Sequence, residues 1–183
     1  RIKKILLKKF LKGVFISDKN LDIDTFFFIE VESNHSKIFY FENDCLKFEQ
    51  SFKFGYDIII KDISKITLFK KEIIEEILND IELKNSISEE ELIEKKFFQD
   101  NNFRKIKKKL IFDIAEARIN EILDLMIFKN INLKYYNKLP KSLFFQLKSA
   151  SSFQGIKDIY KNIFRQKGIL DARCIGKLSH ENM

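Results

Sequence analysis

Residues 25–62 decide the fold, and they read TFFFIEVESNHSKIFYFENDCLKFEQSFKFGYDIIIKD. The apolar run at residues 26–29 suits a strand that is buried on both faces. Ser33 and Asn34 interrupt the pattern, and a second apolar set at residues 37–42 ends at a turn signal. Alternation over residues 46–54 predicts a third strand. After Gly55 the apolar period lengthens towards three or four residues, which predicts a helix over residues 56–66.

Two segments of this stretch resemble known loops and turns. IEVESNHSK, residues 29–37, resembles the second phosphate loop of actin-like ATPases, in which an acidic residue precedes glycines and threonines. Residues 41–64 resemble the FtsA family of actin-like bacterial cell-division proteins, in which a hairpin leads to a glycine and a Thr-x-Asp-Ile-Ala motif. The matching residues are Glu42, Asn43, Gly55, Asp62 and Ile63, whereas Ile60 and Ser64 depart from the motif.

Later segments extend this resemblance over residues 10–164 in scattered identities. FDIAEARINEILDLM, residues 112–126, resembles an FtsA helix through Ile114, Ala117, Arg118, Glu121 and Ile122. Residues 141–155 resemble the strand and loop of the adenosine motif through Ser151 and Gly155, although residues 147–150 replace its threonine and glycines. The resemblance implies an α/β fold: the C-terminal half of an actin-like ATPase (ribonuclease H-like) domain, with a mixed sheet and flanking helices.

The predicted organisation follows the periodicity of the whole chain. A sheet is expected from residues 25–31, 37–42, 46–54 and 142–147, with helices over residues 2–16, 103–128 and 155–164 packed on it. A further helix is predicted over residues 70–79. Residues 1–165 are interpreted as the actin-like half, with a small helical and charged insertion over residues 67–102 whose charged part, residues 81–100, is expected on the surface. Residues 166–183 are predicted to be a weakly structured tail.

The resemblance also implies a nucleotide site that would hold ATP with Mg. Glu30 stands where the family has its metal-organising acid, Ser36 keeps a hydroxyl, and Glu75 matches a ribose-contacting acid, although Leu78 replaces the lysine expected nearby. The residues placed at this site by the resemblance are Glu30, Ser33, Asn34, His35, Ser36, Gly55, Asp62, Glu75, Ser149 and Ser151.

The loops of this site lack the glycines that the chemistry needs. A phosphate loop presents backbone N–H groups at close range, and side chains obstruct that approach. Glu32 adds a negative charge whose repulsion of a phosphate costs roughly a few kcal/mol. Lys148 and Ser149 crowd the place of adenine. We therefore expect ATP binding to be weak or lost, with weak ATPase activity at most.

Other chemistry has little support in the sequence. His35 is interpreted as a turn residue rather than a general base, so no catalytic residue and no metal site are proposed. Cys45 and Cys174 have neither zinc-ligand spacing nor a disulfide framework, which is typical of a reducing cytosol. No apolar run approaches the length that spans a bilayer.

The charge of the chain allows two interpretations. Its 183 residues carry a net charge of +7, which is typical of proteins that bind nucleic acid or lipid headgroups. The basic residues are dispersed, apart from Lys3-Lys4, Lys8-Lys9 and residues 105–109, so compositional bias is the favoured reading. A basic helix over residues 2–16 that lies on a membrane is a further alternative to one packed on the sheet. Nucleic-acid binding is disfavoured because the aromatic and basic motif of an RNA-binding sheet is missing.

Two classes of function follow from the resemblance. The favoured one is an FtsA-like scaffold that links a tubulin-like division protein to the membrane, self-associates as an actin-like protofilament, and works at the cytoplasmic face of the bacterial inner membrane. The alternative is another actin-superfamily ATPase, of the chaperone-like or pilus-assembly type, with residual ATP binding. Because the chain starts at Arg1, we expect a fragment of a longer protein, and we expect an exposed apolar face to cause self-association.

Overall fold

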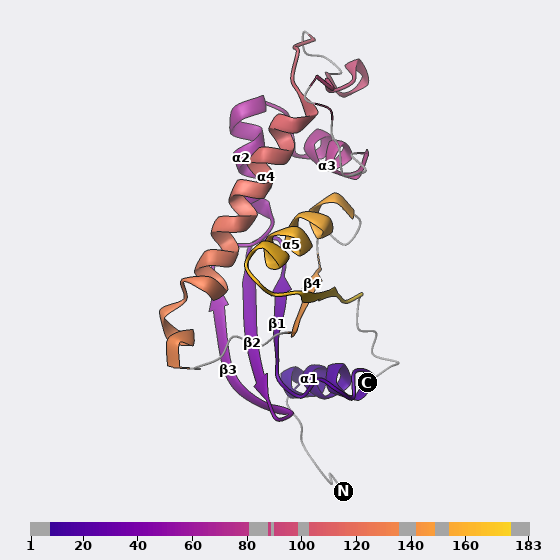
Figure 1. The fold of residues 1–183 in the computed structure, drawn as a ribbon. Coiled ribbons are helices and arrows are strands. Elements are labelled where there is room, and N and C mark those ends of the chain that lie inside the picture. The colour runs from indigo at the N-terminus through magenta and orange to yellow at the C-terminus, as the bar shows by residue number, and fades with distance from the viewer. Residues whose placement is uncertain are drawn as a thin grey trace, which may run out of the picture.

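A five-stranded mixed sheet forms the centre of the molecule (Figure 1). The computed structural model describes residues 8–80, 88, 90–98, 103–135, 142–148 and 154–176. The strand order is β3-β2-β1-β4-β5. The central strand β1 (Phe26–Val31) pairs antiparallel with β2 (Ser36–Glu42) and parallel with β4 (Ser142–Leu147). Strands β3 (Cys45–Phe52) and β5 (Asp171–Cys174) form the two edges.

The sequence of β1 explains its central position. All six of its residues are buried, and alternate residues face opposite sides of the sheet. Phe26 stacks on Phe41 of β2 with ring centroids 5.0 Å apart, and Phe28 is in register with Phe144 of β4. The predicted burial of this strand on both faces and the predicted place of residues 142–147 in the sheet are confirmed.

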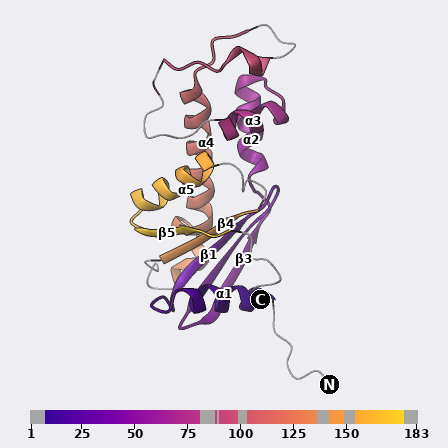
Figure 2. The same cartoon turned by 90° about the vertical axis from the view of Figure 1, so that its right-hand side faces the viewer.

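Helices cover both faces of the sheet (Figures 1 and 2). One face packs against α2 (Asp57–Thr67), α4 (Lys108–Leu123) and α5 (Gln154–Gln166), whose buried residues belong to the larger hydrophobic core. The other face packs against α1 (Lys8–Lys19) through Ile16. Gly13 lies in the middle of α1, and a Cβ atom there would lie 2.0 Å from Cε1 of Phe41. A glycine at this position therefore lets the helix backbone approach the sheet.

The predicted long helix starts later than expected. Residues 103–107 are not helical, because Lys107 forms an antiparallel bridge with Leu92 and the Ile93 N–H donates to the Ile106 carbonyl at 2.8 Å. These tertiary hydrogen bonds override the helical periodicity of the segment. α4 then passes into η2 (Asp124–Phe128), a π-helical segment, and a 3-10 turn, η3 (Ile131–Tyr135), follows.

The chain also forms elements outside the sheet. Helix α3 (Lys71–Asp80) and the 3-10 turn η1 (Lys95–Phe98) lie in the predicted insertion. Phe69 and Phe98, with ring centroids 5.1 Å apart, contribute to its packing. The proposed domain division itself stays a prediction.

The prediction of a weakly structured tail is wrong for residues 171–174. These residues form β5, which pairs parallel with β4, and the Ile175 N–H continues the ladder by donating to the Phe145 carbonyl at 2.8 Å. Asp171 and Arg173 interrupt any apolar pattern in this four-residue strand. The pairing partner, rather than local sequence, therefore determines the strand. Residues 1–7 of the predicted first helix and residues 177–183 lie outside the described part of the chain.

Candidate functional site

The candidate site lies where β1 and β4 end side by side. Val31 pairs with Leu147 at the ends of the two parallel strands, and the Lys148 N–H donates to the Val31 carbonyl at 2.9 Å. Glu32 and Lys148 are thus the first residues beyond neighbouring strands. Open α/β sheets bind ligands outside the carboxyl ends of their strands. This edge is therefore the place where a ligand is expected.

The turn after β1 is held by its own backbone and by the start of α2. The Glu32 N–H donates to the His35 carbonyl at 2.9 Å. The Tyr56 N–H donates to the Glu32 carbonyl at 2.9 Å, and the Asp57 N–H donates to the Ser33 carbonyl at 2.8 Å. These contacts engage N–H groups at the N-terminus of α2, which would otherwise be free to bind an anion.

Gly55 permits this close approach of the two segments. A Cβ atom at this position would lie 2.1 Å from the Glu32 carbonyl oxygen and 2.8 Å from the Ser33 carbonyl carbon. Both neighbours are backbone atoms, so neither can rotate away. Close backbone packing therefore explains why position 55, which matches the glycine of the FtsA motif, is occupied by glycine.

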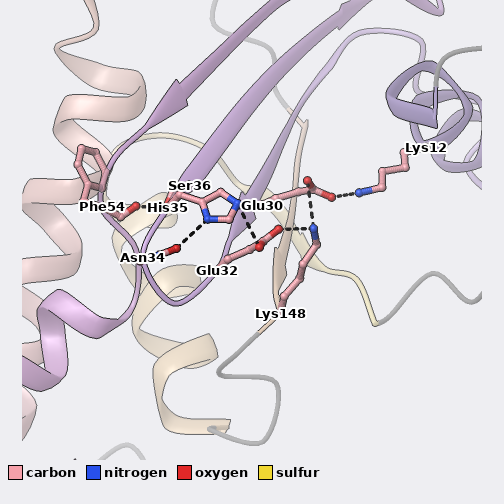
Figure 3. Close-up of polar contacts among 8 residues, drawn as sticks. All are labelled: Lys12, Glu30, Glu32, Asn34, His35, Ser36, Phe54 and Lys148. Atoms are coloured by element: carbon pink, nitrogen blue, oxygen red, sulfur yellow. Dashed lines mark hydrogen bonds and ion pairs between the residues drawn. The ribbon is translucent and has the colours of Figure 1, made fainter.

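Charged side chains from three segments converge on this turn (Figure 3). The Lys148 ammonium group forms ion pairs with Glu32 and, at 3.5 Å, with Glu30. Lys12 of α1 pairs with the other oxygen of the Glu30 carboxylate. The His35 Nε2 atom lies 3.1 Å from Glu32 Oε2. We call these five residues, Lys12, Glu30, Glu32, His35 and Lys148, the ion-pair cluster.

The ion-pair cluster neutralises its own charge. It contains two carboxylates and two ammonium groups, which sum to zero when His35 is neutral. The Glu30 residue is only 3% exposed, so its charge depends on these partners rather than on water.

The pKa shifts agree with stable ion pairing at neutral pH. The hydrogen bond from Lys148 lowers the pKa of Glu32. Burial opposes the charged form of Lys148, but the Glu32 hydrogen bond and the nearby carboxylates raise its pKa overall. A lowered acid pKa stabilises the fold above the unfolded-state value, and a raised lysine pKa stabilises it below that value. Stability from this pair is therefore lost as pH falls through the Glu32 pKa or rises through the Lys148 pKa.

Six of the predicted site residues do come together. They are Glu30, Ser33, Asn34, His35, Ser36 and Gly55. Ser36 is fully buried, and its hydroxyl donates to the Phe54 carbonyl at 2.9 Å. The Asn34 side-chain oxygen lies 2.9 Å from His35 Nδ1. These polar groups thus stabilise the turn itself.

The remaining predicted site residues lie on other elements. Asp62 forms an ion pair with Arg118, joining α2 to α4, and Arg118 also pairs with Glu121, as its spacing predicts. Glu75 of α3 accepts a hydrogen bond from the Tyr56 hydroxyl at 2.5 Å. Burial first, and this hydrogen bond second, raise the pKa of Tyr56. Ser149 and Ser151 lie outside the described residues.

Sequence reasoning missed the pairing within the cluster. It treated Glu32 as a repulsive charge and Lys148 as a separate obstacle, whereas the structure joins them. The parallel register of β1 and β4 would have shown this pairing, because each residue directly follows its strand. The sequence carries no comparable signal for Lys12. This residue contacts Glu30 from α1, which lies on the sheet face opposite to α2, α4 and α5.

The arrangement is an ionic clamp between three segments of the chain. Lys148 ties the end of β4 to the turn after β1, and Lys12 ties α1 to the same carboxylate system. Among the described residues, no group of three or more His, Cys, Asp or Glu side chains could hold a metal ion. In the part of the chain that the structure describes, no helix is long and apolar enough to cross a membrane.

Comparison with known proteins identifies the fold. No family model matches the sequence. The curated proteins contain no match either. Among solved structures, an archaeal actin homologue is 14% identical with a TM-score of 0.55, over 97% of this chain and 52% of its own. The fold is therefore that of actin-like ATPases.

Two further structures agree with this assignment. A PilM–PilN type IV pilus biogenesis complex matches with 7% identity and a TM-score of 0.56, over 95% of this chain and 43% of that one. A non-polymerising mutant of MamK bound to AMPPNP matches with 10% identity and a TM-score of 0.55, over 93% of this chain and 55% of that one. The chain thus spans about half the length of these structures. At such identities the likeness establishes the fold alone.

Proposed function

We propose that this chain is one lobe of an FtsA-like scaffold protein whose phosphate-loop position is filled by internal ion pairs. The observation that carries the proposal is the pairing of Lys148 with Glu32 and Glu30 at the ends of β1 and β4. This contact joins the two loops that the resemblance assigns to phosphate and adenosine. The Lys148 ammonium group thereby lies between the turn after β1 and the end of β4, in the position that we assign to a phosphate.

Nucleotide binding would have to undo this arrangement. A phosphate entering between the turn and β4 would separate Lys148 from Glu32 and leave two carboxylates facing the new negative charge. The carbonyls of Glu32 and Ser33 already accept hydrogen bonds from the start of α2. Both effects oppose binding, and each loss of about 1.4 kcal/mol lowers affinity tenfold.

Removing the obstructing side chains should restore some nucleotide affinity. We expect a variant with glycine in place of Glu32, Ser33, Asn34, Lys148 and Ser149 to bind Mg-ATP at least about tenfold more tightly than the unmodified chain. Because added glycines lower stability by roughly 0.5–1 kcal/mol each in regular elements, a Glu32→Gly/Lys148→Gly variant serves as a second test. Calorimetry on both variants, after circular dichroism shows folding, measures the change. Equal affinity in all three proteins would contradict the role assigned to these side chains.

A second candidate function is an actin-superfamily ATPase with residual ATP binding. The similar MamK structure, which is bound to AMPPNP, favours this candidate. Two lysines at the site would supply positive charge if Glu30 and Glu32 found other partners. Micromolar Mg-ATP affinity in the unmodified chain would support this candidate over the scaffold.

The proposed scaffold role has partners and a place in the cell. Its partners would be a tubulin-like cell-division protein, further copies of the chain and, in the intact protein, the membrane surface. Its location would be the cytoplasmic face of the bacterial inner membrane. The resemblance to the FtsA family supports these proposals, and the similar MamK structure, which is of a non-polymerising mutant, agrees with self-association.

Self-association of the chain is expected to depend on concentration. Exposed apolar side chains such as Leu125 (50%), Ile131 (70%) and Leu170 (80%) provide contact surface. Analytical ultracentrifugation should show an average mass that rises with protein concentration, and a larger species when a tubulin-like division protein is added. A single monomer at every concentration, unchanged by that protein, would argue against the scaffold.

A further inference from the structure

An exposed apolar patch lies at the end of the molecule away from the sheet. Figure 1 shows that the end of α2, α3 and the start of α4 form this end. Three apolar side chains are exposed here: Ile66 by 56%, Leu68 by 69% and Phe103 by 43%. We call Ile66, Leu68 and Phe103 the tip patch.

The tip patch is held in place by contacts with buried residues and with the backbone of α2. The Phe103 ring lies 5.0 Å from that of Phe98, which is buried. The Arg104 guanidinium donates to the Thr67 carbonyl at 2.6 Å, which holds the segment before α4 beside the end of α2. The apolar side chains are therefore presented by a packed scaffold.

Leu68 is an unfavourable residue for the position that it occupies. It forms the C-cap of α2 with φ 59° and ψ 18°, a left-handed conformation in which glycine or asparagine is the usual residue. Its side chain gains little from the fold, because most of it is exposed to water. Neither the backbone geometry of Leu68 nor its packing against the described residues favours leucine, which agrees with a contact made outside this part of the chain.

Three lysines flank the tip patch in the described part of the chain. Within the described residues, Lys65 and Lys105 have no carboxylate partner, and Lys95 lies 5.5 Å above the Phe103 ring. The nearby carboxylates of Glu90, Glu91 and Glu94 pair with Lys107, Lys108 and Lys96. Among the described residues that flank the patch, Lys65, Lys95 and Lys105 therefore leave an excess of positive charge.

We infer that the tip patch binds an anionic lipid surface. Leu68 and Phe103 would enter the boundary between headgroups and acyl chains, while Lys65, Lys95 and Lys105 contact the anionic headgroups. These apolar side chains are exposed at the end of the molecule away from the sheet, which suits contact with a lipid layer. The inference rests on the proposed scaffold role for its membrane setting, but it does not involve the ion-pair cluster.

Vesicle co-sedimentation of the full chain tests this inference. We expect the protein to sediment with phosphatidylcholine vesicles that contain phosphatidylserine, and to stay in solution with phosphatidylcholine alone. Leu68→Asn should abolish most of the binding while keeping the thermal midpoint, because asparagine tolerates the left-handed backbone. Lys105→Ala should weaken binding about fivefold. Leu21→Asn, at an 88% exposed leucine elsewhere, is the matched control and should bind as the unmodified chain does.

Four results would overturn the inference. Sedimentation that does not depend on phosphatidylserine, or no sedimentation with either vesicle, would exclude an anionic lipid partner. Unchanged binding by Leu68→Asn would exclude the tip patch as the contact. A loss of self-association in Leu68→Asn without vesicles would show that the patch contacts a second copy instead. None of these results bears on Mg-ATP affinity, so failure here is distinguishable from failure of the proposal that internal ion pairs fill the phosphate-loop position.

Discussion

Replacing Glu30 with glutamine is expected to lower the free energy of unfolding by about 3 kcal/mol. The Glu30 carboxylate is almost fully buried and forms ion pairs with Lys12 and Lys148. Glutamine keeps the size of the side chain but removes its charge. Lys12, whose side chain is only 12% exposed, would then be a buried cation without its carboxylate. Urea unfolding followed by circular dichroism measures the change.

Glu121→Gln is the matched control for this experiment. Glu121 also pairs with a cationic side chain, Arg118, but its side chain is 56% exposed. Exposed pairs contribute at most about 1 kcal/mol, so this variant should unfold nearly as the unmodified chain does. If Glu30→Gln were as stable as Glu121→Gln, the cluster would not hold α1 and the turn together in the way described.

Gly55→Ala is expected to lower the free energy of unfolding by about 3 kcal/mol or more, because the added methyl group meets backbone atoms rather than a movable side chain. The new Cβ atom would overlap the Glu32 carbonyl oxygen at 2.1 Å. Relief requires the turn and the start of α2 to separate, which weakens the hydrogen bonds from Tyr56 and Asp57. Thermal unfolding should show a clear drop in the midpoint.

Gly176→Ala separates this steric effect from a general effect of alanine. A Cβ atom at Gly176 would have no neighbour within 4 Å. We expect this variant to stay within about 0.5 kcal/mol of the unmodified chain. Equal midpoints for Gly55→Ala and Gly176→Ala would mean that the turn and α2 approach each other less closely than the structure shows.

The strands that carry the fold could be predicted because their own residues require them. The apolar run at residues 26–29 needs burial on both faces, and the turn at Asn43 and Asp44 takes positive φ angles of 49° and 58°, which suit those residue types. The later strand β4 has the same continuous apolar character. These signals are local, and they placed four strands of the sheet.

Elements that depend on distant partners could not be predicted in the same way. β5 contains Asp171 and Arg173 and exists through its pairing with β4. The extended segment before α4 depends on pairing with residues 92 and 93. The ion-pair cluster likewise depends on distant partners. Lys12 and Glu30 are 18 positions apart in the sequence, and Glu32 and Lys148 are 116 positions apart, so the sequence alone does not indicate that their charges pair. Composition shows the charges, and only the sheet register shows that they compensate.

The most direct test of the central claim is isothermal titration calorimetry of the unmodified chain with Mg-ATP. The claim is that Lys148 and the Glu30 and Glu32 carboxylates fill the place of a nucleotide. We expect no binding, or a dissociation constant no tighter than about 1 mM, which corresponds to about −4 kcal/mol. Saturable binding with a micromolar dissociation constant would contradict the claim and identify the chain as a nucleotide-binding actin-like protein.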